Sequence, residues 1–312
     1  MKSISIIFPA TPQSINSVTQ PINVRELIQR TEKQFELADI HFGHGTDNAL
    51  DESFYLVMAA AGLEFDCSEE KLDEPIQQDV LNHIERLIEQ RINQRIPVAY
   101  LVNDAWFAGQ KYYVDERVLI PRSPLAELIT SQFMPWLSFS NVDSILDIGT
   151  GSACIACACA YAFRHARVDA VDVDVDAIKV ANKNVSSHKL EGRVSIIESN
   201  LFEQLKDKKY DLIISNPPYV GNDEMQSLPK EYLHEPGHAL EASDNGLELV
   251  EQILKQASTH LNDNGVLVVE VGNSMDVLIE RYPSMPFTWL EFEEGGHGVF
   301  LLNKTDLEKF NF

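Results

Sequence analysis

Cysteine, positive charge and long apolar runs are all scarce in this sequence. Only four of the 312 residues are cysteines, which excludes the disulfide framework of a secreted domain and favours a reducing, cytoplasmic setting. The longest apolar run, 153–163, is well short of the roughly 20 residues that cross a bilayer. The apolar patch within residues 1–9 is too brief for a signal peptide. We therefore expect no membrane span and no export signal.

Basic residues are outnumbered almost two to one. The chain has 48 acidic and 25 basic residues, a formal net charge of -23, and we find no run of lysine or arginine. Such a charge repels nucleic acid phosphate and attracts basic partners. We therefore expect a basic protein substrate and no direct binding of nucleic acid. The simpler interpretation, that the acidic surface only keeps the protein soluble, stays open.

Helical periodicity dominates the first part of the chain. Apolar residues recur at helical spacing between residues 22 and 95, which predicts several amphipathic helices. Asn23 and Glu26 form a capping box at the start of the first helix, and Gly62 is a plausible stop for the second. We expect residues 1–97 to form a small helical domain that recognises the substrate.

The spacing of apolar residues changes twice after this helical part of the chain. Aromatic and β-branched residues around Gly109 predict a β-hairpin, which we take as a connector over residues 98–122. From residue 123 to 312 short apolar runs alternate with helical stretches, which predicts a mainly parallel sheet covered by helices on both faces. A terminal hairpin should add an antiparallel strand. The predicted strands are 144–148, 168–173, 194–198, 212–215, 266–270, 289–292 and 299–302.

A glycine loop follows the first strand of this sheet. Gly149 and Gly151 allow a tight turn that brings bare backbone against a ligand. Asp172, at the end of the next strand, can accept both hydroxyl protons of a ribose. A dinucleotide fingerprint needs a third glycine where Cys154 stands. The loop therefore favours S-adenosylmethionine, which carries an adenosine but no phosphate.

Three other groups of residues invite functional interpretations. Cys154 and Cys157 lie within one predicted helix without a second ligand pair, which favours small buried core residues over a zinc or redox site. His41 and His44 lack the carboxylate partners of a metal motif, so we assign no metal. Trp106 and the other tryptophans are expected to pack in the core or between domains.

The next motif follows a buried strand. Asn216-Pro217-Pro218-Tyr219 stands at the carboxyl end of strand 212–215, where ligands bind in parallel sheets. An amide nitrogen is a poor nucleophile because its lone pair is delocalised into the carbonyl. The Asn216 oxygen and the Pro217 carbonyl could accept both N–H bonds of one amine and turn its lone pair toward a methyl donor. Tyr219 could offer a flat face to the planar group. The alternative is a rigid turn.

Taken together, these residues resemble the class I methyltransferases, and specifically the protein-glutamine N5-methyltransferase family of the HemK type. The resemblance spans nearly the whole chain. It implies a Rossmann-like α/β sheet with a small N-terminal helical domain and a connecting β-hairpin. The segments most similar to the branch that methylates large-subunit ribosomal protein three are 120–124, 228–232, 234–236, 272–275 and 287–292. The implied substrate is a glutamine side chain of that basic ribosomal protein.

The resemblance also implies roles for particular residues. Asn216, Pro217 and Tyr219 would be catalytic, and with Pro218 would hold the glutamine. The implied cofactor-binding residues are Asp147, Gly149, Thr150, Gly151, Ser152, Asp172, Asn200, Leu201 and Asn216.

This chain departs from the family at three positions, of which Asn245, in place of a usual aspartate, has no effect that we can assign. Ala153 replaces a usual glycine, and we expect its methyl group to be tolerated if its φ stays negative. Asn200 replaces a usual aspartate, and its amide oxygen can still accept a hydrogen bond from an adenine amino group.

Two other functions remain open at this point. The Asn-Pro-Pro-Tyr motif also serves exocyclic amines of nucleic acid bases, so an adenine-N6 methyltransferase is an alternative. Such an enzyme should carry a basic face, which this acidic chain lacks. The departures at Ala153 and Asn200 also suit a cofactor-binding assembly factor without turnover.

Overall fold

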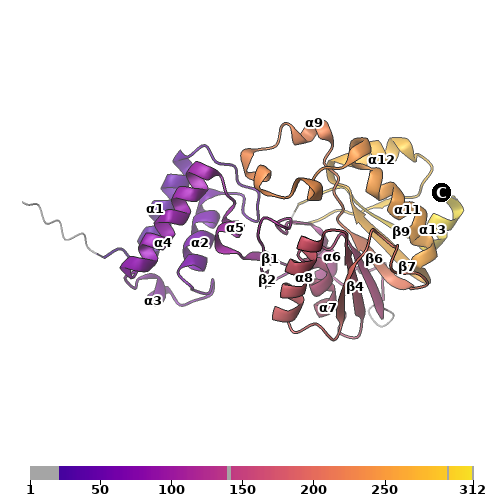
Figure 1. The fold of residues 1–312 in the computed structure, drawn as a ribbon, viewed down its shortest axis with the longest axis horizontal. Coiled ribbons are helices and arrows are strands. Elements are labelled where there is room, and N and C mark those ends of the chain that lie inside the picture. Colours follow the sequence, from indigo (N-terminus) through magenta and orange to yellow (C-terminus); the bar gives the residue numbers. More distant parts are fainter. Residues whose placement is uncertain (1–20, 139–141, 294, 311–312) are drawn as a thin grey trace, which may run out of the picture.

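The computed structural model describes residues 21–138, 142–293 and 295–310. The expectation about an export signal, which rests on residues 1–9, lies outside this part of the chain. Within it, no helix has both the length and the apolar character needed to cross a membrane. Figure 1 shows a helical region at one end of the molecule, joined through a short hairpin to a larger α/β region.

The helical region begins with the capping box predicted from the sequence. The Asn23 side chain accepts the backbone N–H of Glu26, and the Glu26 carboxylate accepts the N–H of Asn23. Gly62 ends the second helix with a φ of 69°, which glycine adopts at little cost. The elements are α1 (Val24–Leu37), α2 (Ala49–Ala60), α3 (Glu69–Leu72), α4 (Gln78–Glu89), the π-helix η1 (Gln90–Gln94) and α5 (Val98–Val102).

The hairpin after α5 consists of β1 (Ala105–Phe107) and β2 (Gln110–Tyr112). Ala108 and Gly109 form its turn with φ values of 47° and 73°, the two positive values of a type I′ turn. The hairpin is confirmed, but residues 98–102 of the expected connector form the helix α5 instead. Five residues offer too little helical periodicity to reveal α5 in the sequence.

The α/β region contains a seven-stranded sheet in the order β5-β4-β3-β6-β7-β9-β8. The strands from β5 to β7 are parallel, and β9 pairs antiparallel with both β7 and β8, as the terminal hairpin predicted. The strands are β3 (Ser144–Ile148), β4 (Arg167–Asp172), β5 (Val194–Glu198), β6 (Tyr210–Ser215), β7 (Leu261–Glu270), β8 (Thr288–Trp289) and β9 (Val299–Asn303). The predicted strand 289–292 was too long, because only the Leu290 N–H still reaches the Val299 carbonyl of β9.

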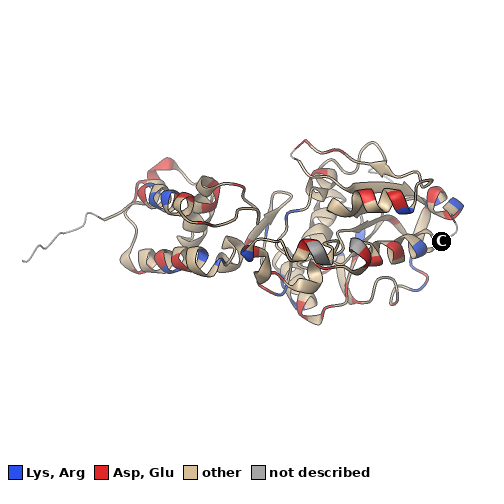
Figure 2. Cartoon of the chain, turned by 90° about the horizontal axis from the view of Figure 1, so that it is seen from above, with Lys and Arg blue, Asp and Glu red and all other residues tan. Residues whose placement is uncertain are grey.

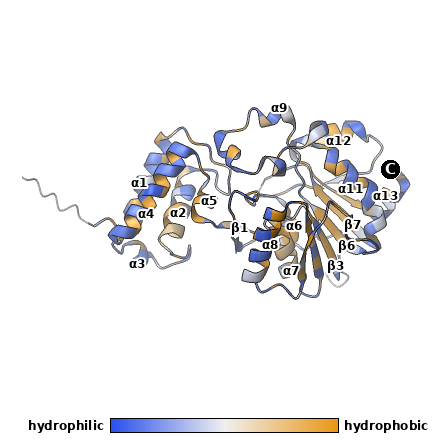
Figure 3. Ribbon diagram, viewed as in Figure 1, coloured by the Kyte–Doolittle hydropathy of each residue, from blue (hydrophilic) through white to orange (hydrophobic). Residues whose placement is uncertain are grey.

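Two apolar layers enclose this sheet. Alternate residues of each strand face opposite sides, so that Ile145 packs with α6 (Leu125–Thr130), α7 (Cys154–Ala162) and α8 (Val175–Ser187). Leu146 packs with the opposite layer of α11 (Glu248–His260), α12 (Met275–Arg281) and α13 (Lys304–Phe310). Figure 3 shows the apolar strands between the amphipathic helices. The predicted α/β class is therefore confirmed.

Short helices occupy the loops at the edge of the sheet. They are α9 (Asn222–Met225), η3 (Lys230–His234), η4 (Gly237–Ala239), α10 (Ser243–Gly246) and η5 (Gly272–Ser274). All but η5 belong to the long connection between β6 and α11. This connection begins at the Asn-Pro-Pro-Tyr motif and covers the carboxyl end of the sheet (Figure 1).

Two expectations about side chains have different outcomes. The cysteines of α7 are buried in the core, as expected: Cys154 is 7% exposed and Cys157 is fully buried. Trp289 packs against Phe300 in the core. The expectation that every tryptophan packs in the core or between domains was wrong for Trp136, which is 40% exposed. Trp106 is 41% exposed, but its ring contacts Phe65 of the helical region.

Candidate active site

The glycine loop joins β3 to α7 at the carboxyl end of the sheet. Gly149 and Gly151 have φ values of 70° and 52°, and a Cβ atom at either position would meet no atom within 4 Å. The N–H groups of Gly149 and Thr150 donate to the Val171 carbonyl of β4, at 2.9 and 3.0 Å. Strand pairing thus fixes the loop, while its glycines leave bare backbone beside open space.

Asp172, the last residue of β4, connects this loop to the neighbouring strand. Its Oδ2 accepts the N–H of Gly151 at 2.8 Å, and its Oδ1 accepts the N–H of Asp174 at 2.9 Å. Burial raises the pKa of this carboxyl group. Each oxygen keeps a further lone pair, so two hydroxyl groups of one ligand could bind side by side.

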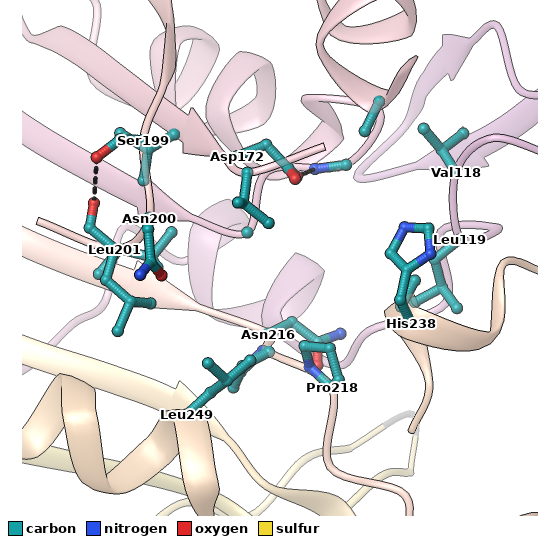
Figure 4. A pocket seen from close by; sticks show the side chains of 18 of the residues that line it. Val118, Leu119, Asp172, Ser199, Asn200, Leu201, Asn216, Pro218, His238 and Leu249 are labelled. Carbon is teal, nitrogen blue, oxygen red and sulfur yellow. Dashed lines mark hydrogen bonds between the residues drawn. The ribbon is translucent and has the colours of Figure 1, made fainter. Parts of the chain in front are cut away.

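Eight of the residues predicted for the site line one cavity. Figure 4 shows Asp172 on one side and Asn216 with Pro218 on the other, with Asn200 and Leu201 closing one end. Apolar side chains, among them Val118 and Leu249, complete the wall. The predicted residues in the lining are Gly149, Gly151, Asp172, Asn200, Leu201, Asn216, Pro217 and Pro218.

Asp147 supports the loop from behind. Its side chain is fully buried, and its Oδ2 accepts the Thr150 hydroxyl at 2.6 Å and the Ala156 N–H at 3.1 Å. Its Oδ1 is buried and has no hydrogen-bond partner among the described residues. Burial raises the pKa of Asp147 to about 7. Thr150 and Asp147 therefore order the loop, and the Oδ1 atom of Asp147 stays as a buried acceptor next to it.

Ser152 contributes to the loop through its backbone. The Ser152 carbonyl accepts the Asn184 side-chain amide at 2.8 Å, which ties the loop to α8. The Ser152 side chain is buried at 3% exposure. Like Thr150, Ser152 is placed to shape the loop from within.

Ala153 contradicts the expectation of a negative φ. Its φ is 64°, because the loop turns here into α7 and the Ala153 N–H donates to the Thr150 carbonyl at 2.8 Å. Left-handed backbone costs a residue with a Cβ atom roughly 1–2 kcal/mol. The methyl group is fully buried in the core, and its burial offsets part of that cost.

Asn200 and Leu201 follow β5 and its Ser199. The Asn200 amide nitrogen donates to Glu203 Oε1 at 3.1 Å, so the amide oxygen is left as an acceptor. The Ser199 hydroxyl donates to the Leu201 carbonyl at 3.0 Å, the dashed line of Figure 4. This geometry is compatible with the predicted contact of Asn200 with an amino group, which stays a prediction.

The Asn-Pro-Pro-Tyr segment begins directly after β6. The half-buried side chain of Asn216 makes no hydrogen bond to any other described residue. Pro217 and Pro218 have no N–H, so the backbone presents carbonyl groups in this part of the wall. Donors of a bound amide would therefore find unpaired acceptors here.

Tyr219 is placed differently from the expectation. Its hydroxyl donates to Glu270 Oε1 at 2.9 Å, and its carbonyl accepts the Ser274 hydroxyl at 2.9 Å. One side of its ring lies against Gly272, where a Cβ atom would come within 2.5 Å of the ring. Glu270 also accepts the Ser123 hydroxyl. Tyr219 is not among the residues that line the cavity, and its contacts hold the motif in place.

His238 is a cavity residue that the sequence did not reveal. It lies on η4, and its Nε2 is 2.8 Å from Asp174 Oδ2 at the start of α8. This contact joins the connection after the motif to the N-cap of α8, two residues beyond Asp172. A single histidine in a loop gives no signal of such a distant contact in the sequence.

Buried ion pairs hold the same connection to the rest of the chain. Arg91 of η1 is 1% exposed and contacts both Glu52 and Glu231, the latter at 3.1 Å. Arg122 binds Glu235 through two bonds of 2.6 and 2.7 Å. Glu231 and Glu235 both belong to segments singled out for their family resemblance, and they anchor the connection to the helical region and to the segment before α6.

Comparison with known proteins identifies the family. A family model described as the methyltransferase small domain matches residues 129–243. The ribosomal protein uL3 glutamine methyltransferase of Francisella tularensis is 42% identical over 92% of this chain and 92% of its own length. The enzyme of the same name from Neisseria meningitidis is 41% identical over 97% and 98%. The chain belongs to the uL3 glutamine methyltransferase family.

Membership in this family makes the chain a methyltransferase. The resemblance found in the sequence is confirmed, and the assembly factor without turnover is set aside. Among solved structures, the hMettl16 catalytic domain in complex with MAT2A 3′UTR hairpin 6 gives a TM-score of 0.48 at 18% identity, over 73% of this chain and 81% of that one. This likeness is too distant to bear on function. The described residues contain no cluster of three or more histidine, cysteine or acidic side chains placed for a metal ion.

Proposed function

We propose that this protein transfers a methyl group from S-adenosylmethionine to the N5 amide nitrogen of a glutamine in ribosomal protein uL3. The observation that carries the proposal is the shared cavity: the Asn216-Pro217-Pro218 segment lines the same space as the glycine loop and Asp172. The names of the two relatives supply the substrate. An acceptor amide and an adenosine-containing donor would then meet at one sheet edge.

The residues of the cavity fit the proposed cofactor. Asp172 offers two oxygens to the ribose hydroxyls, and Gly149 and Gly151 let the cofactor approach the backbone. The unpaired Oδ1 of Asp147 suits the ammonium group of the methionine end. When bound, the cofactor supplies an electrophilic methyl group on a sulfonium ion.

The chain's own contribution to the reaction is orientation. The Asn216 side-chain oxygen and the Pro217 carbonyl accept the two N–H bonds of the glutamine amide. These bonds hold the nitrogen so that its lone pair points out of the amide plane toward the donor, rather than into the carbonyl. One amide proton leaves to water as the methyl group arrives. Tyr219, fixed by Glu270, keeps the segment in place.

The domain organisation follows the same proposal. We assign residues 1–97 to substrate recognition, 98–122 to the connector and 123–312 to catalysis. Figure 2 shows that acidic residues occur along the backbone of both regions. The net charge of -23 favours a basic ribosomal protein over RNA. A cytoplasmic location agrees with this substrate.

Labelled S-adenosylmethionine tests the proposal directly. The protein is incubated with purified uL3 and, separately, with ribosomal RNA, and the product is mapped by mass spectrometry. We expect one methyl group on a glutamine of uL3. Label found only on RNA would overturn the substrate assignment.

Asn216→Ala separates catalysis from cofactor binding. This variant should abolish methyl transfer while calorimetry gives an almost unchanged cofactor affinity. Asn182→Ala, on the exposed surface of α8, provides the matched control and should behave as wild type. Equal loss of transfer and of cofactor binding would reject Asn216 as the residue that holds the amide.

A further inference from the structure

A second concave site lies between the helical region and the hairpin. It is formed by the loop after α1, by α2, by β1 and by the segment before α6. We call it the aromatic groove. Its lining residues with functional side chains are His44, Asp47, Asp51, Phe54, Phe65, Trp106 and Arg122.

One wall of the groove is a row of aromatic rings. The ring centres of Phe54 and Phe65 are 5.5 Å apart, and those of Phe65 and Trp106 are 5.4 Å apart. Trp106 is 41% exposed although it is a large apolar side chain. Phe65 belongs to the helical region and Trp106 to the hairpin, so the wall crosses from one to the other. Such rings suit the stems and planar heads of basic side chains.

The rim of the groove carries unneutralised negative charge. Asp47 and Asp51 are exposed, and neither has a lysine or arginine nitrogen within 4 Å in the described part of the chain. The Asn48 side-chain amide donates to both, at 2.6 and 2.8 Å, and holds the two carboxylates close together. Two like charges held together favour a bound cation. The positive charge of Arg122, in contrast, is neutralised by Glu235.

The floor of the groove contains a buried imidazole. His44 is 5% exposed, and its Nε2 lies 3.5 Å from Oε2 of Glu235, the carboxylate that Arg122 also binds. The histidine therefore faces the connection after the motif, and the charge of the groove comes from its rim.

The groove is linked to the methyl-transfer motif. Arg122 lines it and is followed by Ser123, whose hydroxyl donates to Glu270. Glu270 in turn accepts the hydroxyl of Tyr219. One short segment thus lines the groove and also contacts the glutamate that fixes Tyr219 of the motif.

We propose that the aromatic groove binds a basic segment of the protein substrate that flanks the methylated glutamine. Lysine or arginine side chains of this segment pair with Asp47 and Asp51, and their stems lie along Phe54 and Trp106. This inference rests on the proposed function and adds a recognition site to it. The groove therefore selects among glutamines by the charge of their neighbours.

The double variant Asp47→Asn, Asp51→Asn tests the groove. Each screened ion pair contributes a factor of roughly 1.5 to 5 in affinity. For two such pairs we expect KM for uL3 to rise about twofold to twenty-fivefold, with kcat and cofactor affinity unchanged. The matched control is Glu74→Gln, Asp79→Asn, which removes two exposed charges of the same helical region and should leave KM near the wild-type value.

A variant of uL3, used as a second substrate, makes the test specific. In this variant, the lysines and arginines within ten residues of the methylated glutamine are replaced by glutamine. The wild-type enzyme should have a raised KM for this uL3 variant. The groove variant of the enzyme should show little further increase in KM, because the basic side chains that pair with Asp47 and Asp51 are already absent. If the enzyme variant and the uL3 variant raised KM independently, so that their factors multiplied, the inference would be overturned. An unchanged KM of the groove variant for wild-type uL3 would overturn it as well. Failure of the wild-type enzyme to methylate uL3 would instead reject the proposed function.

Discussion

Replacing Asp147 by asparagine is expected to stabilise the protein above neutral pH. Asp147 is fully buried, accepts hydrogen bonds from Thr150 and Ala156 through Oδ2, and leaves Oδ1 unpaired. Burial therefore raises the pKa of Asp147 to about 7. Asparagine keeps the shape and the acceptor oxygen but carries no charge. The variant thus removes the cost of ionising a carboxyl group in the core.

The size and sign of the effect follow from this pKa. A carboxyl group whose pKa rises from 3.8 to about 7 on folding contributes stability that is present at low pH and is lost as pH rises through 7. The shift corresponds to about 4 kcal/mol, of which about 2 kcal/mol is lost between pH 5 and 7. The protonated carboxyl group has one donor without a partner and the amide has two. Asp147→Asn should therefore be about 1–3 kcal/mol less stable than wild type near pH 4, and this difference should shrink and then reverse as pH rises.

Urea denaturation at a series of pH values between 5 and 9 measures this divergence. The free energy of unfolding of Asp147→Asn minus that of wild type should increase up to pH 7 and then level off. Exposed Asp207→Asn controls for the loss of a carboxylate. Parallel curves for wild type and Asp147→Asn would refute the reasoning. If Asp147 meets the ammonium group of the cofactor, the same variant should also bind S-adenosylmethionine at least tenfold more weakly at pH 8.

Three further changes have expected outcomes. Glu231→Ala leaves Arg91 with one fewer carboxylate in a buried site, so urea denaturation should show a loss of about 3 kcal/mol or more; a loss below 1 kcal/mol would contradict a buried pair. His238→Ala removes a contact across the cavity, and calorimetry should give a two- to fivefold weaker cofactor affinity. Ala153→Gly trades relief of a positive φ against a lost methyl group, so the free energy of unfolding should change by less than about 1 kcal/mol. Ala158→Gly, at an ordinary helical position, should cost about 2 kcal/mol, and equal losses in both would contradict the strain at Ala153.

Local patterns predicted most of the fold. Strand β3 is buried along most of its length and appears in the sequence as a short apolar run. Both β3 and the partly exposed edge strand β5 have the predicted bounds. The capping box of Asn23 and Glu26 is equally local, because its partners are three residues apart. Helix α5 was missed because only five residues form it, and Ala153 was misjudged because its φ depends on how the loop meets α7.

The site was predictable only in part. The glycine loop, Asp172 and Asn216 were found because each stands at a strand end, and parallel strands bring their carboxyl ends together. Pairs such as Arg91 with Glu231 and Asp174 with His238 were not found. Their members are far apart in sequence, and no spacing rule relates them before the tertiary structure is known.

The buried pairs have a consequence for substrate selection. A buried ion pair contributes little net stability compared with apolar residues of similar size, because removing two charges from water is costly. What Arg91–Glu231 and Arg122–Glu235 do provide is a fixed geometry, since each arginine has several donors in a rigid plane. They hold the connection that follows the Asn-Pro-Pro-Tyr motif against the helical region on one side and against the wall of the aromatic groove on the other. A glutamine whose flanking segment also fits the groove would thus be methylated at a lower substrate concentration, because the same connection contacts both sites.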